Sequence, residues 1–232
     1  MNVKLITPQD HIFENIVDQI AYMARVSNPS NQNNTETNER LLRYLIKHKH
    51  WSPFEMQSIC LEIHTTRDIA RQILRHRSFS FQEFSQRYAD PESMGYPFEL
   101  RDARIQDETN RQNSLELDPE MDGHAILQGQ WINHQKRVMD SAEAAYKWAI
   151  DSGIAKEQAR AVLPEGNTKS RMYMNGTVRS WMHYIDLRTT PGTQKEHMEV
   201  ARACAYAINP VFPMIKEFVH EQNQDDSISG SV

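Results

Sequence analysis

The sequence predicts an α+β fold in which helices are in the majority. Residues 57–64 alternate, with Ile59 and Leu61 on one side, which is the pattern of a half-buried strand. Several longer segments instead carry apolar residues three and four positions apart, as an amphipathic helix does. The 232 residues contain no internal repeat, so we expect a single domain over residues 1–222 and a flexible tail over residues 223–232.

The first half of the chain is expected to alternate between short strands and helices. Thr35 or Thr37 is expected to cap the second helix, and Thr66 the third. The alternation of Phe79 and Phe81 predicts a return to extended structure. In order, we expect a strand over 3–6, helices over 12–26 and 38–49, the strand over 57–64, and a helix that begins at Thr66 and delivers Arg75 to Arg77 at its end.

The second half begins with the least patterned stretch of the chain. Residues 100–123 are mostly polar, and we expect a long excursion or lid there, because loops of this length are usually functional or disordered. A long helix over 125–152 follows, and its predicted buried seam is Trp131, Val138, Ala142, Ala145 and Ala149. Beyond it we expect a helix over 156–163, a strand over 170–175, and helices over 178–187, 194–208 and 211–220.

The composition argues against several classes of protein. The formal net charge is −5, whereas general nucleic-acid binders usually carry a basic excess. Hydrophobic residues make up 39% of the chain, which is enough for a core but favours burial that is completed by oligomerisation. No apolar run is long enough to span a membrane, and the N-terminus lacks a signal-peptide core. We therefore expect a protein that binds neither membrane nor nucleic acid. The two cysteines have no CxxC partner, so we expect it to be cytoplasmic.

Common motifs for phosphate, metal and covalent chemistry are missing from the sequence. Neither GxGxxG nor GxxxxGK[ST] occurs, so arginine side chains would have to bind any phosphate. His48 and His50 are spaced for different faces of a helix, and we expect no metal site, because zinc needs three or four convergent ligands. Cys60 lies in a strand pattern and Cys204 between alanines, so both are expected in the core and neither as a nucleophile.

Residues 75–88 combine cations, hydroxyl groups and rings in a way that no core requires. Hydroxyl and amide groups beside arginines favour a nucleotide ligand, because guanidinium groups hold phosphate. An equal alternative on physical grounds is that the arginines only form salt bridges, with Glu83, Glu157 and Asp186 as partners. The alternating phenylalanines are more often sheet core than stacking platforms.

A longer pattern within this stretch resembles a known family. Arg75-His76-Arg77 is followed after two residues by Ser80, after four more by Ser85 and after one more by Arg87. This pattern is the signature of the flavin-dependent thymidylate synthases, and so many fixed positions make a chance match improbable. The similarity covers most of residues 20–215, including residues 24–27, 48–55, 158–164 and 176–196, and the polar residues around 100–120 resemble a subgroup of the family.

The resemblance implies a fold, an assembly and a reaction. The fold would be a central, mostly antiparallel sheet flanked by helices, in a homotetramer that binds FAD in active sites at its subunit interfaces. The enzyme, a methyltransferase, would convert dUMP to dTMP by reductive methylation. Methylenetetrahydrofolate would give the carbon, and NADPH would reduce the flavin. No covalent protein nucleophile would be needed, which agrees with the lack of a plausible catalytic cysteine.

The resemblance also assigns residues to each ligand. Arg188 resembles the arginine that activates dUMP at N3, where a fixed cation stabilises the deprotonated uracil and raises the electron density at C5. Thr177 and His183 stand where many members carry asparagine, and Gly192 where some carry histidine, so nothing catalytic is placed at Gly192. The residues assigned to the flavin are His50, which also resembles a residue near the folate, Ser52, Arg75, His76, Arg77, Glu83, Thr177, Val178, Arg179 and His183. Those assigned to dUMP are Gln72, Arg75, Glu83, Phe84, Ser85, Gln86, Arg87, Arg160 and Arg188.

An alternative from another class is a module that binds nucleic acid or nucleotide without catalysis. Residues 66–77 would then act as a basic recognition helix. The acidic net charge of the chain argues against this alternative.

Overall fold

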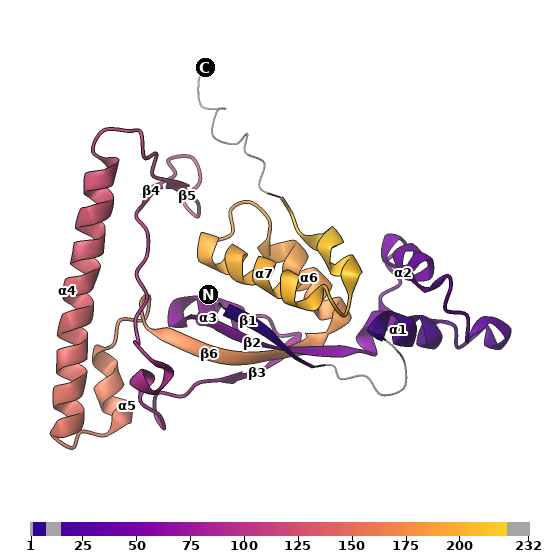
Figure 1. Ribbon diagram of the computed structural model, residues 1–232, viewed down its shortest axis with the longest axis horizontal. Helices are drawn as coiled ribbons and strands as arrows, with labels where there is room; N and C mark the ends of the chain where they lie inside the picture. Colours follow the sequence, from indigo (N-terminus) through magenta and orange to yellow (C-terminus); the bar gives the residue numbers. More distant parts are fainter. Residues whose placement is uncertain (1, 8–14, 222–232) are drawn as a thin grey trace. The chain divides into compact units, whose positions relative to one another are not determined.

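The computed structural model describes residues 2–7 and 15–221, and it has an α+β fold with an antiparallel sheet flanked by helices (Figure 1). The main sheet has four strands in the order β1-β2-β6-β3, and a separate sheet pairs β4 with β5. The strands are β1 (Asn2–Thr7), β2 (Ser58–Thr66), β3 (Phe79–Glu83), β4 (Arg104–Gln106), β5 (Ser114–Glu116) and β6 (Lys169–Thr177). The α-helices are α1 (Ile16–Ala24), α2 (Asn38–Lys47), α3 (Arg67–Ile73), α4 (His124–Asp151), α5 (Lys156–Ala159), α6 (Val178–Arg188) and α7 (Lys195–Ile208). Short 3₁₀ helices are η1 (Pro29–Asn31), η2 (Ser52–Glu55), η3 (Pro91–Met94), η4 (Arg160–Val162) and η5 (Pro213–Phe218).

The chain divides into two compact units. The first unit consists mainly of Ile63–Arg77 and Phe81–Tyr173, and the second mainly of Val3–Glu62, Ser78–Ser80 and Met174–Val232. The strands predicted over 3–6, 57–64 and 170–175 and the helices predicted over 178–187 and 194–208 are confirmed within two residues. The helix predicted over 156–163 is split into α5 and η4, and of the helix predicted over 12–26 the part before residue 15 lies outside the described residues.

The core of the second unit includes the face of α6 that packs on the sheet. Ile59 and Leu61 alternate as predicted and are fully buried, and Trp181 on α6 donates its ring N–H to the carbonyl of Ile59 (2.9 Å). The Phe79 ring stands edge-on to Trp181, with ring centroids 4.8 Å apart, so Phe79 is part of the core and not a stacking platform. Gly176 is required beside it, because any side chain there would overlap the Phe79 ring.

The end of α2 differs from the prediction because its last turn closes early. The sequence predicts a helix to Lys49, but the helix ends at Lys47. Lys49 has a φ of 57°, and its N–H donates to the carbonyl of Ile46 (3.0 Å) while that of His50 donates to Leu45 (2.9 Å). This pair of bonds is a Schellman motif, in which glycine usually takes the left-handed position that Lys49 occupies here. The strained lysine therefore sets the direction in which the chain continues to His50.

A buried arginine holds the start of α2. Thr37 precedes the helix as predicted, but its side chain makes no capping bond; its Oγ1 accepts from Arg25 instead (3.0 Å). Arg25 is only 6% exposed, and it also donates to the carbonyl of Asn34 (2.7 Å) and to the side chain of Asn38. A buried guanidinium needs an acceptor for each donor, so Arg25 joins α1 to the loop that precedes α2.

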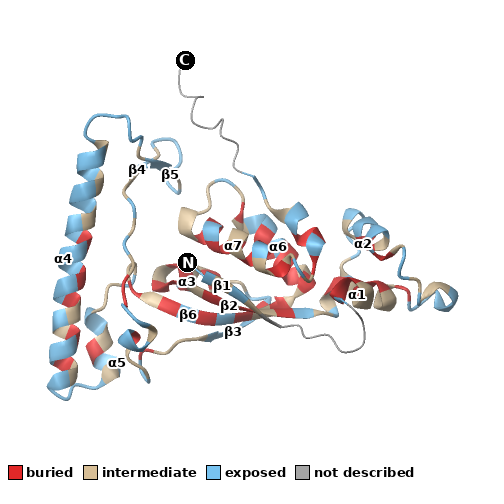
Figure 2. Cartoon of the chain, viewed as in Figure 1, coloured by how far each residue is buried: buried red, intermediate tan, exposed pale blue. Residues whose placement is uncertain are grey.

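The helix α4 is the longest of the chain, and its buried seam is shifted from the predicted one (Figure 2). Trp131 and Val138 are predicted to be buried, but they are 42% and 53% exposed. The observed seam consists of Gln135, Met139, Ala142, Tyr146 and Ala149, so that only Ala142 and Ala149 are predicted correctly as buried.

Gln135 accounts for the shift of the seam. Its side-chain amide donates to the carbonyl of Arg101 and accepts from the N–H of the same residue, both at 2.8 Å. Asn167 donates to it as well (3.0 Å). The amide thus pairs with an extended backbone much as a neighbouring strand would. A prediction from apolar periodicity counts glutamine as an exposed residue. The face of α4 that carries Gln135 is therefore predicted to be exposed.

The predicted polar excursion contains a hydrogen-bonded hairpin. Its strands β4 and β5 pair antiparallel. Between them the carboxylate of Asp107 accepts from the N–H of Thr109 (2.8 Å), the Thr109 hydroxyl (2.7 Å), the N–H of Asn110 (3.0 Å) and the side-chain amide of Asn113 (2.8 Å). These bonds, with the one from Asn113 first, lower the pKa of Asp107 well below its usual range.

The last predicted helix is wrong in type. Residues 213–218 form the 3₁₀ helix η5 and not an α-helix. The tail predicted over 223–232 lies outside the described residues. Within the described part of the chain, no helix is both long enough and apolar enough to cross a membrane.

Acid is expected to open the hairpin through Asp107. The pKa of Asp107 is lowered in the folded hairpin, so its carboxylate stabilises the hairpin above the ordinary aspartate pKa of about 4, and this contribution is lost as the pH falls through that value toward the lowered one. We expect the hydrogen-exchange protection of Thr109 and Asn110 to stay constant from neutral pH to about pH 4 and to decrease below it. Asp107→Asn should remove this dependence, and Asp122→Asn, at an exposed aspartate of the same segment, should keep it. Protection that persists in strong acid in the unaltered protein would contradict the role of Asp107.

The start of α6 supplies a second prediction. The Oγ1 atom of Thr177 accepts from the N–H of Ser180 (3.2 Å), so Thr177 is the N-cap of the helix. Asparagine, which many members of the resembled family carry here, caps helices equally well. We expect Thr177→Ala to lower the free energy of unfolding by about 1 kcal/mol in urea denaturation, and Thr177→Asn to change it much less. Thr35→Ala, at an exposed threonine that caps nothing, is the control; equal losses in both Thr177 variants would count against the cap.

Candidate active site

The structure places the predicted site residues in two groups, one in each unit. The second unit holds His50, Ser52, Thr177, Val178, Arg179, His183 and Arg188. The first unit holds Gln72, Arg75, His76, Arg77, Glu83, Phe84, Ser85, Gln86, Arg87 and Arg160. Contacts within each group decide which side chains are tied to the protein and which remain available to a ligand.

In the second unit, Glu55 organises the start of α6. Its carboxylate accepts from the Thr177 hydroxyl (3.1 Å) and from the guanidinium of Arg179 (2.6 Å). Arg179 lies one turn before His183, with 3.5 Å between its Nε and the Nε2 of the histidine. The exposed ring of His183 stands edge-on to Trp51, with centroids 4.9 Å apart. A hydroxyl, a cation and an imidazole therefore form one polar face, and Glu55, which is absent from the predicted residues, orients two of them.

A short segment anchored in the core presents Ser52 and His50. The 3₁₀ helix η2 begins at Ser52, which is exposed, whereas its Phe54 is fully buried, with its ring 6.2 Å from that of Phe212. His50 is exposed as well and follows the left-handed Lys49. The buried Phe54 fixes the backbone of this segment, so the exposed side chains of Ser52 and His50 are available to a ligand at defined positions.

Arg188 ends α6 one turn after a buried tyrosine–histidine pair. Tyr184 and His197 are both buried, with 3.2 Å between the tyrosine hydroxyl and the Nε2 atom of the histidine. Burial raises the pKa of Tyr184 well above its usual value, and the positive charge of Arg188 opposes this shift. A cation in the last turn of a helix is favoured by the helix dipole. Val178, in contrast, is fully buried, so only its backbone could face a ligand.

In the first unit, the turn that follows α3 leaves two arginines free. Arg75 and Arg77 are exposed, and no hydrogen bond or ion pair to a described residue holds either guanidinium. Backbone bonds close the turn: the N–H of Arg75 donates to Gln72 (3.3 Å) and that of His76 to Ile73 (3.0 Å). Two free cations on a hydrogen-bonded turn suit an anionic ligand.

Glu83 is a partner of a buried cation. Arg67, at the start of α3, is 7% exposed, and its guanidinium lies 3.7 Å from the carboxylate of Glu83 and 3.4 Å from that of Glu165. The hydroxyl of Ser170 also donates to Glu83 (2.8 Å). Arg71 binds Glu165 as well (2.9 Å); burial works to raise the pKa of Glu165, but the two arginines together lower it. The arginines of α3 are therefore tied into the protein.

Glu157 brings together two arginines that the resemblance assigns to dUMP. The Nε of Arg87 lies 3.6 Å from its carboxylate, and Arg160 donates to its backbone carbonyl (3.3 Å). Between Ser85 and Arg87, Gln86 is only 3% exposed, and its side-chain nitrogen has no hydrogen-bond partner among the described residues. An unsatisfied buried amide costs about 1–3 kcal/mol, so we expect an ordered water to supply the acceptor that the described residues do not.

Salt bridges account for only part of the arginine set. Of the three predicted carboxylate partners, Glu157 does contact Arg87. Asp186 pairs with His220 (2.8 Å) and Glu83 with an arginine outside the predicted set. The purely structural alternative therefore leaves the exposed arginines of the turn unexplained.

The helix α3 does not have the basic face that a recognition helix would need. It covers only Arg67–Ile73, its first arginine is buried, and Arg71 is paired with Glu165. Thr66, predicted as its cap, makes no side-chain capping bond; its hydroxyl donates to Asp68 (2.5 Å). The structure thus disfavours the nucleic-acid alternative for this segment.

Neither cysteine has the surroundings of a nucleophile. Cys204 is fully buried as predicted, and burial raises its pKa. Cys60 is half-buried on the polar side of β2 instead of in the core, and burial raises its pKa too. Both side chains are therefore thiols rather than thiolates at neutral pH. Among residues 2–7 and 15–221, no group of three or more His, Cys, Asp and Glu side chains could hold a metal ion.

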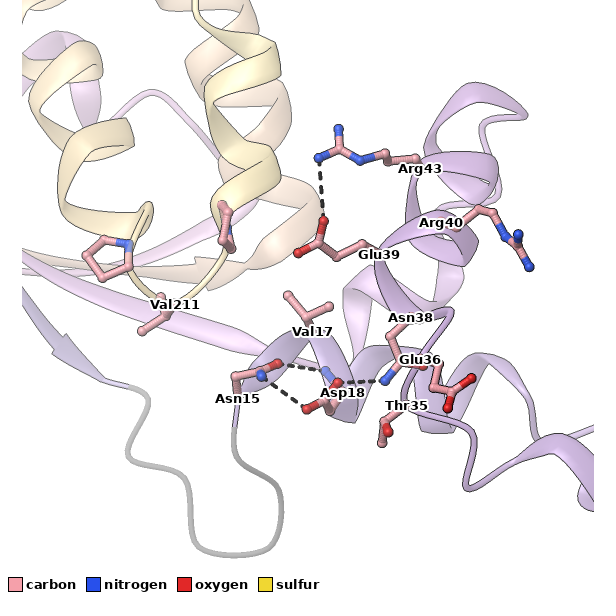
Figure 3. A pocket seen from close by; sticks show the side chains of 12 residues that line it. Asn15, Val17, Asp18, Thr35, Glu36, Asn38, Glu39, Arg40, Arg43 and Val211 are labelled. Atoms are coloured by element: carbon pink, nitrogen blue, oxygen red, sulfur yellow. Dashed lines mark hydrogen bonds and ion pairs between the residues drawn. The ribbon is translucent and has the colours of Figure 1, made fainter.

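The second unit contains a cleft of about 660 Å³ (Figure 3). At its edge Asp18 is bonded to Asn15 and Asn38, and Arg43 is paired with Glu39. The cleft is lined by Asn15, Val17, Asp18, Thr35, Glu36, Asn38, Glu39, Arg40, Arg43, Pro210, Val211 and Pro213. No residue assigned to flavin or dUMP lines it.

Known proteins resemble this chain over most of its length. The family described as thymidylate synthase complementing protein matches residues 12–214. A probable flavin-dependent thymidylate synthase from Paramecium bursaria Chlorella virus 1 is 47% identical over 218 residues, which cover 93% of this chain and 97% of that protein. A flavin-dependent thymidylate synthase from Synechocystis sp. is 48% identical over 197 residues, which cover 84% of this chain and 86% of that protein.

A solved structure shares the fold. The UMP/dUMP methylase PolB from Streptomyces cacaoi, bound with 5-Br dUMP, matches 94% of this chain and 93% of its own with a TM-score of 0.77 and 28% sequence identity. The exposed arginine turn, the matched residues and this shared architecture agree with one another. The chain therefore belongs to the thymidylate synthase complementing protein family.

Proposed function

We propose that the protein is a flavin-dependent thymidylate synthase that converts dUMP to dTMP. Family membership supports this proposal, and one feature of the structure carries it: the signature turn presents Arg75 and Arg77 exposed, with no described residue to neutralise them. Free cations of this kind suit anionic cofactors and substrates. In the proposed reaction methylenetetrahydrofolate gives a methylene group, and NADPH with one proton gives the reducing equivalents through FAD. The products are dTMP, tetrahydrofolate and NADP⁺.

The residues assigned to FAD fit the chemistry of that cofactor. Arg75 and Arg77 could bind its diphosphate, because one guanidinium can donate to two oxygens at once. Thr177, Arg179 and His183 offer a hydroxyl, a cation and an imidazole on one face, which suits the polar edge of a flavin ring. FAD would supply hydride transfer, which no side chain can provide.

The residues assigned to dUMP fit a nucleotide phosphate. Arg87 and Arg160 both contact Glu157, the first at its carboxylate and the second at its backbone carbonyl, so we assign both guanidinium groups to one anion. Ser85 and Gln86 directly precede Arg87 in the chain, and the Ser85 hydroxyl adds an uncharged donor. We therefore assign this group to the phosphate and the arginine at the end of α6 to the base.

The arginine at the end of α6 is the proposed catalytic residue. A guanidinium beside N3 of the uracil would stabilise the deprotonated base and raise the electron density at C5, where the new carbon is attached. The buried pair of Tyr184 and His197 gives Arg188 a fixed support one turn away. With that electrostatic activation, the reaction needs no cysteine attack at C6.

Assembly and closure belong to the same proposal. Family membership supports the expected homotetramer, whose active sites would be completed at subunit interfaces, and the expected single catalytic domain over residues 1–222. We propose that residues 100–123 act as a lid, because a hydrogen-bonded hairpin can move as one body. Cys60 and Cys204 are free thiols, which supports an enzyme that works in the cytoplasm.

The visible spectrum of the purified protein tests the proposed function. A flavin spectrum that bleaches when NADPH is added without oxygen, together with dTMP formed from dUMP and methylenetetrahydrofolate, is the expected result. A protein that is colourless and does not bind added FAD would overturn the proposal.

Arg188→Ala is expected to keep FAD and lose turnover. Removal of the cation at N3 should lower kcat by at least about 100-fold, because a positioned charge is a large part of the catalysis proposed here. Flavin content from the spectrum and dTMP formation by chromatography give the two readouts. Arg40→Ala, at an exposed arginine outside the proposed site, should leave both unchanged. Near-normal dTMP formation by Arg188→Ala would contradict the role at N3.

Cys60→Ala and Cys204→Ala are expected to stay active, because neither thiol has a lowered pKa. Cys204 is fully buried, so its variant should lose about 1 kcal/mol of stability, and turnover is best measured well below its Tm. Abolished turnover in a folded variant would restore cysteine catalysis as an explanation.

A further inference from the structure

The helix α4 has a second apolar stripe beside its buried seam. Leu127, Trp131, Val138 and Trp148 are 40%, 42%, 53% and 66% exposed, and none of them belongs to the seam that the first unit covers. Figure 2 shows exposed surface along the whole length of this helix. Large apolar side chains gathered on one exposed face usually mark an interaction site.

The spacing of this second stripe is that of a helix that packs against another helix. Its members follow one another at alternating intervals of four and three residues, the repeat that keeps one face toward a partner helix. At 1.5 Å per residue the stripe is about 30 Å long. We call this set the α4 stripe: Leu127, Trp131, His134, Val138, Ser141, Ala145 and Trp148.

The order of side-chain sizes along the α4 stripe favours one direction for a second copy of the helix. In a parallel copy each member faces its own kind, so the small Ser141 and Ala145 meet small residues and leave a gap between the large rings. An antiparallel copy, related by a two-fold axis between Met139 and Asp140, reverses the order. Each small residue then faces a larger one and the rings pair at both ends: Trp131 with Trp148, His134 with Ala145, and Val138 with Ser141.

The charges around the α4 stripe are compatible with the same arrangement. The stripe contains no lysine, arginine, aspartate or glutamate, as is usual for the buried centre of an interface. Along its edge away from the seam, every seventh residue is exposed: Gln130, Arg137, Ala144 and Asp151. Between antiparallel copies Arg137 faces Ala144 and Gln130 faces Asp151, so no like charges meet across the axis.

We propose that the α4 stripe is the interface with a second copy of this chain, whose α4 runs antiparallel across a two-fold axis. The proposal rests on the homotetramer of the proposed function but not on its reaction. An interface of this symmetry needs a surface that is complementary to itself, and the reversed order of large and small side chains meets that requirement. Trp131 and Trp148 are the anchors, because tryptophans dominate the energies of such contacts.

Sedimentation velocity of the full chain tests the interface. Trp148→Glu places a charge within the α4 stripe, and it should raise the dissociation constant at least about 30-fold and halve the mass of the assembly at micromolar concentration. Ile126→Glu is the matched control, because Ile126 and Trp148 are both 66% exposed on the same helix, but Ile126 lies outside the stripe. This control should keep the mass of the unaltered protein.

A mixture of two variants tests the direction of the second helix. His134→Glu and Ala145→Lys each place one charge within the α4 stripe, and each alone should weaken association at least about 10-fold. Mixed in equal amounts, they should recover most of the mass, because the new carboxylate of one copy meets the new ammonium group of the other. In a parallel pair the two charges would stand eleven positions apart, about 16 Å along the axis, and could not compensate each other.

An unchanged mass for Trp148→Glu would overturn the proposal, and so would a mixture that associates no better than its two variants do alone. A lowered Tm of Trp148→Glu without a change of mass would overturn it as well, because residues of the same chain would then cover the stripe. The flavin spectrum and NADPH bleaching of the unaltered protein report the proposed function separately. A colourless protein that still associates through α4 would contradict the proposed function but not the proposed interface.

Discussion

The first unit depends on the burial of one guanidinium, that of Arg67. Its carboxylate partners are Glu83, the last residue of β3, and Glu165, and its own N–H donates to the carbonyl of Thr168 (2.9 Å). Removing one partner of a buried ion pair costs about 3–5 kcal/mol, because the remaining charge is left without compensation. Arg67 and Glu83 also bracket the signature turn in the sequence. The pair therefore closes the loop that carries the free arginines.

The same physics separates structural arginines from those available to ligands. Arg67 and Arg71 are held by carboxylates, so they have little to offer an anion from outside. Arg75 and Arg77 are exposed, and water alone screens their charge in the described part of the chain. In the sequence these four cations look alike, since all lie on or just after one helix. Burial and pairing, which depend on residues far along the chain, distinguish them.

The sequence predicts those features of the fold that neighbouring residues determine, and it does not predict those that depend on residues far apart in the chain. The alternation of Ile59 and Leu61 and the periodicity of α6 are local, and both predictions are confirmed. The seam of α4 depends on Gln135 pairing with a backbone more than thirty residues earlier, which no helical pattern contains. The hairpin depends on the carboxylate of Asp107, which accepts hydrogen bonds from the N–H groups of the turn that follows it. The type of η5 has no such local signal, because Pro213 stands at its first turn, where an α-helix tolerates proline as well.

The candidate site shows the same division. The signature residues are evident from their sequence pattern alone, and the structure brings Thr177, Arg179 and His183 to one face. Glu55, which orients that face, carries no periodic signal, although it lies within one of the segments that resemble the family. Nor does Arg67 stand out, because the resemblance assigns its partner Glu83 to ligands and not to the protein.

The two interpretations left open for Arg87, salt bridge or phosphate donor, do not exclude each other. Its contact with Glu157 is 3.6 Å long, and the side chains are 54% and 51% exposed. Such a pair is worth about 0–1 kcal/mol, because water and ions screen it. A charge-assisted bond to phosphate is worth more, about 1.5–3 kcal/mol, and a guanidinium can make two. In the proposed enzyme, Glu157 would therefore keep Arg87 near Arg160 before substrate arrives and yield it to the phosphate afterwards. A stronger, buried partner, such as Glu83 is for Arg67, would hold the arginine in place and prevent that exchange.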